Sequence, residues 1–281
     1  FFLVPALIVF KISLSQPAVA QPPYVPTLDF AAGVDGFRGF VAALSFENYR
    51  LIVSDSLYLS AYLRSLEIAG LATAMLLGLG LPFAYAMTRT GPRTQMVLLM
   101  LVILPFWTAF LIRVYAWMTI LQRDGLLNQM LTALGLTDTP ASWLASDTAV
   151  FIGLVYSYLP FMVLPIYASL ERIDRTLLEA AADLGATPTR AFWRITVPLA
   201  MPGVVAGALI CFIPIVGEFV IPDLLGDSSN LMIGQTLWTE FFANRDWPLA
   251  AAVAMVMLVV LIGPIVAYEQ MQSRALKARE G

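Results

Sequence analysis

The sequence contains no histidine and a single cysteine, Cys211, which stands inside an apolar run. These absences exclude a disulfide framework, a zinc site built from cysteine and histidine, and acid–base catalysis by histidine. Charged residues make up only 12% of the chain, against about 25% in a soluble domain. Hydrophobic residues make up 59% of the 281 residues. A chain this apolar cannot cover its surface with polar groups, so the composition predicts a protein that folds in a lipid bilayer.

Long apolar segments recur along the whole chain. A helix needs about 20 apolar residues to cross the hydrocarbon core, and every segment but the first reaches that length. The runs are continuous rather than alternating, which favours helices over the strands of a barrel. We therefore expect an all-α membrane protein that forms one domain over residues 1–281. The six predicted transmembrane helices fall at about 1–15, 62–88, 96–121, 148–170, 197–222 and 248–268.

The first apolar segment has two interpretations. Phe1–Phe10 followed by Ala18-Val19-Ala20 resembles the apolar region and cleavage site of a secretory signal peptide. No basic stretch precedes it, however, and five further spans follow. We favour a truncated first transmembrane helix, because the sequence opens at Phe1 inside the apolar run.

Positive charge is divided unevenly between two sets of loops. The first set comprises the loops 89–94 and 171–194 and the tail 269–281, and it carries nine Lys/Arg. The second set comprises the loops 16–57, 122–147 and 223–247, and it carries four Lys/Arg and eleven acidic residues. Because cytoplasmic loops are enriched in Lys and Arg, we expect both termini in the cytoplasm. An acidic outer mouth favours entry of cations, although translocated loops also simply avoid Lys and Arg. The proline-rich loop 16–57 is expected to be irregular, with one short helix near 47–57.

The loop at 171–196 carries the signals of two short helices. Asp174 or Thr176 can cap a helix over 176–184, whose alanine-rich centre favours helix. Gly185 suits the left-handed position that ends it. Thr187 then caps a second helix with Pro188 at its first position. This compact pair suggests a docking site for a partner protein. An amphipathic helix lying on the membrane is the alternative, but the loop lacks the large hydrophobic face that such a helix needs.

The same loop resembles a known signature. Glu179-Ala180-Ala181, Gly185 six residues after the glutamate, and then Ile195 and Pro198 are similar to the EAA motif of ABC importer permeases, with Val197 replacing the usual leucine. Further segments resemble polyamine permeases, most closely the first permease of the putrescine importers of Gram-negative bacteria. These segments are Leu104–Trp107, Ile112–Trp117, Gly217–Pro222, Leu224–Gly226, Met232–Gly234 and Asn244–Pro248.

This resemblance implies the fold of a type I ABC importer permease and import of polyamines, putrescine first and spermidine second, across the bacterial inner membrane. The implied partners are a homodimeric ABC ATPase, a second permease that completes a heterodimer, and a periplasmic substrate-binding protein; no nucleic acid is expected. The chain has no GxxxxGK[ST] loop, so ATP and Mg²⁺ are expected on the ATPase. We expect no catalytic residue, metal or cofactor here. The implied ATPase-coupling residues are Glu179, Ala180, Ala181, Asp183, Leu184, Gly185, Ala186 and Thr187.

Two charged residues, Arg113 and Glu218, stand inside predicted spans, where an ionisable group usually faces a pathway or a partner. Either an ion pair between them fixes helix packing, or Glu218 supplies a negative group to the substrate path. Aromatic faces attract alkylammonium ions, so aromatic residues near these two charges are candidates for the substrate path. Trp117 and Trp143 are better explained as residues at the membrane interface. The candidate path residues are Trp107, Arg113, Tyr115, Glu218, Phe219, Asp223 and Glu240.

Three other classes of protein compete with an ABC permease. A secondary transporter of small cations or amines predicts inverted repeats, which the sequence does not display, and leaves the 171–196 loop unexplained. A membrane-embedded enzyme needs a catalytic cluster at one depth, and the predicted spans offer only five charged residues: Lys11, Arg64, Glu67, Arg113 and Glu218. A purely structural subunit would differ from a permease in a transport assay.

Overall fold

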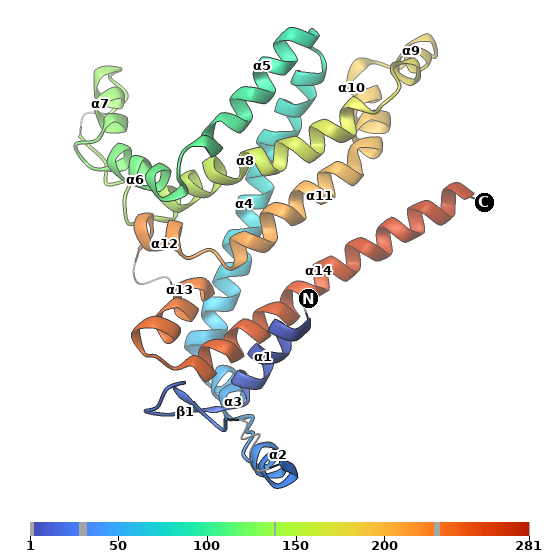
Figure 1. Ribbon diagram of the computed structural model, residues 1–281. Coiled ribbons are helices and arrows are strands. Elements are labelled where there is room, and N and C mark those ends of the chain that lie inside the picture. Colours follow the sequence, from blue (N-terminus) through green and yellow to red (C-terminus); the bar gives the residue numbers. More distant parts are fainter. Residues whose placement is uncertain (1–2, 28–32, 138, 228–230, 281) are drawn as a thin grey trace.

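The computed structural model describes residues 3–27, 33–137, 139–227 and 231–280, and helices dominate it (Figure 1). Residues 1–2 of the predicted first span and the outer-loop acids Asp29 and Asp138 lie outside the described residues. Four described helices are long and apolar enough to cross a membrane, which confirms the all-α membrane class. They are α4 (Ser56–Thr88), α8 (Asp147–Glu171), the continuous run Pro188–Val216 and the part of α14 (Trp247–Glu280) up to Val266.

The predicted third span, 96–121, is not one helix. α5 (Pro92–Ile103) passes into the 3-10 turn η2 (Leu104–Trp107), and α6 (Phe110–Leu121) leads on to α7 (Leu126–Ala133). The two halves of this segment are bent by 93°. Pro105 has no N–H to continue a helical ladder, and Thr108 and Ala109 take extended backbone conformations. The expectation of a straight helix was wrong because the break at 108–109 interrupts it.

Two other predicted spans have different bounds in the structure. α1 (Leu3–Ser13) has 11 residues and packs against α14. The run Pro188–Val216 joins α10 (Pro188–Ala191), the π-helical turn η3 (Phe192–Thr196) and α11 (Val197–Val216). It ends before Gly217, and α12 (Val220–Leu225) follows after a short break. The helical run therefore begins and ends earlier in the chain than the predicted span 197–222, and Glu218 lies in the break rather than inside a helix.

Short elements gather at one end of the molecule, opposite α9 (Arg175–Asp183) in Figure 1. The strands β1 (Gln16–Pro17) and β2 (Tyr24–Val25) pair antiparallel, with Gln16 opposite Val25. α2 (Gly33–Ala42) and α3 (Glu47–Ser54) follow, and α3 confirms the short helix expected near 47–57. α13 (Ile233–Trp238) and the π-helical turn η4 (Thr239–Ala243) complete this end.

α8 lies at the centre of the helical core and packs against both α4 and α11. Glycines allow this close approach. A Cβ added at Gly203 of α11 would lie 2.4 Å from the backbone oxygen of Pro165 and 2.4 Å from Oγ of Ser169. A Cβ added at Gly80 of α4 would lie 2.8 Å from Cγ of Met162. Small residues at such contacts are the usual way for membrane helices to pack closely.

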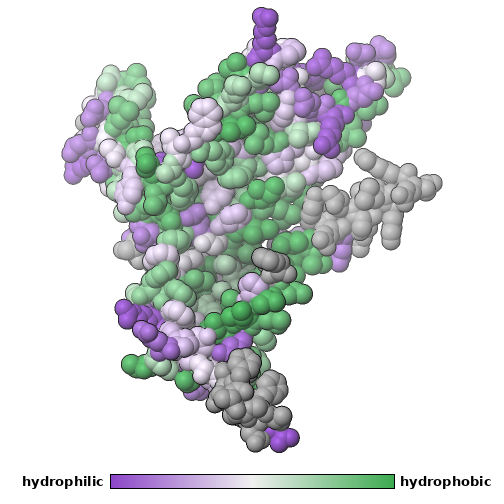
Figure 2. Space-filling view, viewed as in Figure 1, coloured by the Kyte–Doolittle hydropathy of each residue, from purple (hydrophilic) through white to green (hydrophobic). Residues whose placement is uncertain are grey.

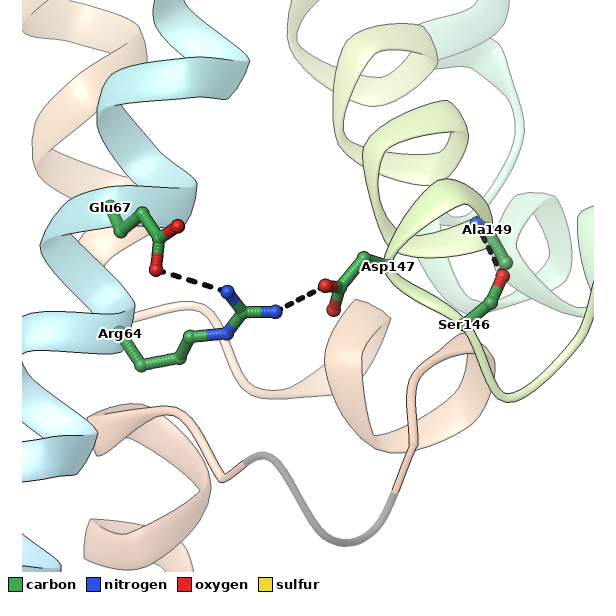
Figure 3. Close-up of polar contacts among 5 residues, drawn as sticks. All are labelled: Arg64, Glu67, Ser146, Asp147 and Ala149. Carbon is green, nitrogen blue, oxygen red and sulfur yellow. Dashed lines mark hydrogen bonds and ion pairs between the residues drawn. The ribbon is translucent and has the colours of Figure 1, made fainter.

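A charged cluster joins the N-terminal part of α4 to the start of α8 (Figure 3). Arg64 Nη1 lies 3.0 Å from Glu67 Oε2, and Arg64 Nη2 pairs with Asp147 Oδ2. Ser146 caps α8, because its Oγ accepts a hydrogen bond from the Ala149 N–H at 3.2 Å. Arg64 is thus paired with two carboxylates, and such pairing is expected for ionisable groups in a membrane helix.

Candidate functional site

The loop around α9 is built as its sequence predicts. Asp174 caps α9, and its carboxylate accepts a hydrogen bond from the Thr176 N–H at 3.0 Å, which lowers the pKa of Asp174. Gly185 has φ +78°, a left-handed conformation that costs a glycine nothing. The Gly185 N–H bonds the Ala182 carbonyl and the Ala186 N–H bonds the Ala181 carbonyl, each at 2.9 Å. This is the Schellman pattern that closes a helix C-terminus.

A second short helix follows at once. The Thr187 hydroxyl accepts a hydrogen bond from the Arg190 N–H at 3.4 Å, with Pro188 at the first position of α10. Two of the eight predicted coupling residues are not fully exposed: Ala181 is buried and Ala186 is half-buried. The hydrogen bond between their backbones stabilises the loop. Leu184 is 89% exposed, which is unusual for a leucine at the end of a tight turn. The other exposed members are Glu179, Ala180, Asp183, Gly185 and Thr187.

A cavity of about 440 Å³ lies between the bent α5–α6 segment, the middle of α8 and the end of α11. Its wall is largely aromatic and apolar, with four polar side chains. The apolar members are Phe106, Phe110, Phe161, Ile210 and Pro214, and the polar members are Arg113, Ser157, Tyr158 and Glu218.

Glu218 is held in this wall by two hydrogen bonds. Tyr158 donates its hydroxyl to Oε2 at 2.8 Å, and the Val220 N–H donates to Oε1 at 3.0 Å. Because α11 ends at Val216, the backbone turn that follows places the carboxylate at the cavity rather than against lipid. A carboxylate in an aromatic cavity is suited to binding a cation.

Arg113 lines the same cavity, but the expected ion pair with Glu218 is absent among the described residues. The guanidinium is 9% exposed and lies 5.4 Å from the Phe106 ring and 5.8 Å from the Phe110 ring. Its Nε and Nη1 have no hydrogen-bond partner within the described chain. The ion pair was one of two alternatives that followed from placing both residues inside continuous spans, and the breaks at 108–109 and 217–219 interrupt those spans.

The other predicted path residues do not line this cavity. Trp107 is 83% exposed and Tyr115 is 49% exposed. Phe219 stacks on Trp238 with ring centroids 4.4 Å apart. The remaining two are Asp223, which is exposed, and Glu240, which accepts hydrogen bonds from Tyr58 and Asn244.

Sequence reasoning missed Tyr158 and Ser157, which supply polar groups from α8. A signal was present, because three consecutive hydroxyl-bearing residues, Tyr156, Ser157 and Tyr158, interrupt an otherwise apolar run from Ala149 to Pro165. Phe161 stands three residues after Tyr158 and lies on the same face of the helix. Nothing local to Glu218 identified its partner 60 residues earlier in the chain.

The fold and these two sites define a helical membrane protein with a largely apolar cavity that carries four polar side chains, and with an ordered, exposed loop. Residues 71–269 match the family described as binding-protein-dependent transport system inner membrane component. The chain belongs to this family. It is thus a membrane-spanning permease subunit of an ABC transporter, a transport component rather than the ATP-hydrolysing one.

Several relatives are similar over most of their length. The spermidine/putrescine transport system permease protein PotB of Haemophilus influenzae is 41% identical over 81% of this chain and 79% of its own. PotB of Escherichia coli K12 is 44% identical over 76% of this chain and 78% of its own. The putative 2-aminoethylphosphonate transport permease PhnU of Salmonella typhimurium is 27% identical over 84% of this chain and 83% of its own.

Solved structures share the fold at low sequence identity. A bacterial alginate ABC transporter, solved with an alginate-bound periplasmic protein, matches with a TM-score of 0.71 at 18% identity, over 98% of this chain and 93% of that one. The MetNI methionine ABC transporter matches with a TM-score of 0.57 at 18% identity, over 76% of this chain and 93% of that one. Family and neighbours together imply a complex with an ATPase and a binding protein.

Proposed function

We propose that this chain is one of two permease subunits of a polyamine importer, with putrescine as its first substrate and spermidine as the second candidate. The observation that carries the proposal is the 41–44% identity to PotB proteins over most of both chains. The cavity agrees with a cationic substrate, because it combines the Glu218 carboxylate with three phenylalanine rings. The alternative, a secondary transporter of small amines, leaves the family match unexplained.

The proposed assembly places this chain, as a single permease domain over residues 1–281, beside a different permease in the bacterial inner membrane. A homodimeric ATPase docks on the loop Glu179–Thr187 and holds ATP and Mg²⁺, while this chain binds no cofactor. A periplasmic protein delivers the substrate. The excess of Lys/Arg in the loops on the α9 side supports a cytoplasmic location for that end and for both termini.

The proposed mechanism is alternating access between outward-open and inward-open states. Such a shift needs contacts that differ in free energy between the states. Glu218 gives the cation a favourable contact, and the Arg113 guanidinium in the same wall, which has no ion pair among the described residues, repels the cation and so favours its release. The remaining candidate path groups, Trp107, Tyr115, Phe219, Asp223 and Glu240, lie outside this cavity and serve, in this proposal, the approach to it.

The test is co-expression of this chain with its genome-neighbour ATPase, second permease and binding protein in cells that lack polyamine uptake. We expect the ATPase to co-purify with the wild-type chain and radiolabelled putrescine to enter the cells. The double variant Glu179→Arg/Gly185→Glu is expected to insert normally and lose both properties. Asp124→Arg is the matched control, since it reverses a charge in an outer loop and should retain both.

Two outcomes would contradict the proposal in different ways. If the ATPase does not bind the wild-type chain, the coupling assignment fails. If the complex assembles but unlabelled putrescine and spermidine in excess leave uptake of the labelled substrate unchanged, the polyamine assignment fails while the importer assignment stands.

A further inference from the structure

A second, smaller cavity lies where the ends of α4 and α8 meet α9, far from the central one. It has a volume of about 140 Å³. In Figure 2, hydrophilic side chains gather at this end of the molecule, around α9 and α10. The side chains in its wall that carry polar groups come from different parts of the chain: Tyr85, Thr88, Arg89, Gln95, Glu171, Arg175 and Thr196. Nothing in the transport proposal uses this cavity.

The wall carries an excess of positive charge. Arg89 donates a hydrogen bond to the Tyr85 hydroxyl at 2.6 Å, and its guanidinium lies 4.8 Å from the Tyr85 ring. Neither Arg89 nor Arg175 has a carboxylate within ion-pair distance in the described chain. Glu171 is the one acid in the wall, and Gln95 Nε2 lies 3.5 Å from its Oε1. Two guanidinium groups against one carboxylate leave one unit of positive charge without a counter-charge.

The cavity also contains an unused hydrogen-bond donor. Thr196 is 3% exposed, and its Oγ1 has no hydrogen-bond partner in the described part of the chain. A buried hydroxyl without a partner costs free energy, which an acceptor in the cavity would recover. A ligand that satisfies this wall must therefore be negative and must offer several acceptor oxygens to donors from different directions.

A phosphate group has these properties. It carries negative charge on several oxygens, and arginine is the side chain best matched to it. We propose that this cavity binds a phosphate group, supplied either by the headgroup of an anionic phospholipid or by a soluble phosphate. The bound group contacts Arg89 from the end of α4, Arg175 from α9 and Thr196 from η3, and so joins three elements around the start of α9.

The experiment uses the assembled transporter, purified in detergent. Retention of phosphatidylglycerol and of phosphatidylcholine is measured by native mass spectrometry, and the effect of inorganic phosphate is measured as a shift in melting temperature. In Arg89→Gln/Arg175→Gln, binding of the effective probe is expected to weaken by about tenfold or more, because two charge-assisted contacts are lost. Thr196→Val, which keeps the side-chain volume, is expected to weaken it by roughly threefold.

The matched control is Arg172→Gln/Arg194→Gln. It removes the same charge from the same end of the molecule, at exposed positions outside the cavity wall, and it should bind like the wild type. Selective retention of phosphatidylglycerol that only the cavity variants lose identifies the lipid as the source. A melting shift with inorganic phosphate that only the cavity variants lose identifies a soluble phosphate.

The proposal is overturned if the wild type responds to neither probe, or if the control variant loses as much binding as the cavity variant. Thr196→Val is the variant least expected to disturb folding, because it leaves every charge in place, so weaker binding by this variant reports on the cavity itself. None of these readouts depends on which substrate the transporter carries.

Discussion

The α9 loop and the central cavity are fixed by different kinds of interaction. In the loop, each capping hydrogen bond joins residues close in sequence, such as Asp174 with Thr176 and Ala181 with Ala186. In the cavity, Tyr158 meets Glu218 from 60 residues away, and Phe106 packs on Phe161 with ring centroids 4.9 Å apart. The loop therefore depends on local sequence, whereas the cavity depends on how helices pack.

The largest effect is expected where helix packing sets the cavity. Gly203→Leu places side-chain atoms where Pro165 and Ser169 already lie, and overpacking of this kind costs about 3 kcal/mol. Gly78→Leu is the matched control, because nothing lies within 4 Å of a Cβ added there. Thermal unfolding of the purified chain in detergent should show a much lower midpoint for the Gly203 variant alone. Equal midpoints would show that α8 and α11 can separate without cost.

A smaller effect is expected from the cavity chemistry. Glu218→Gln keeps an oxygen for the Tyr158 hydroxyl and removes the charge. Putrescine uptake should fall by about tenfold, the cost of one charge-assisted contact, while assembly with the ATPase is unchanged. Glu47→Gln, at an exposed position on α3, should transport normally. Wild-type uptake by the Glu218 variant would remove this carboxylate from the substrate path.

A third effect should be confined to the loop. Gly185→Ala forces a side chain into a left-handed conformation, which costs about 1 kcal/mol. We expect weaker co-purification of the ATPase with no change in the melting temperature of the membrane helices. Gly91→Ala is the control, since Gly91 has φ −70° and open space around it. A lower melting temperature for Gly185→Ala would contradict the view that the loop folds locally.

The smallest effect concerns pH. The hydrogen bond from the Thr176 N–H holds the pKa of Asp174 below its ordinary value of 3.8. The cap is therefore fully present at neutral pH and is lost as pH falls through the lowered pKa. Hydrogen exchange of the α9 amides, corrected for intrinsic rates, should quicken below about pH 4. Asp174→Asn does not titrate, so its exchange should lack this pH dependence.

The same division explains what the sequence could predict. Asp174, Gly185, Thr187 and Pro188 specify the loop by their intrinsic preferences, and the structure places each in its expected role. The long apolar helices could also be predicted from the sequence. Hydropathy does not register a helix break, so the bend near Pro105 was missed. The partners of Glu218 and Arg113 depend on that bend and on the end of α11, and no local pattern encodes them.

The glycine contact between α8 and α11 has a mechanical consequence. α9 lies between these two helices in the chain. The two helices approach closely at Gly203, about two turns into α11 at about 3.6 residues per turn. We expect two helices in such close contact to move as one unit. Tyr158 lies about 20 Å along α8 from its end at Glu171, at about 1.5 Å per residue. We therefore expect a rotation imposed at the loop to displace the cavity wall through the two helices, about their contact near Gly203.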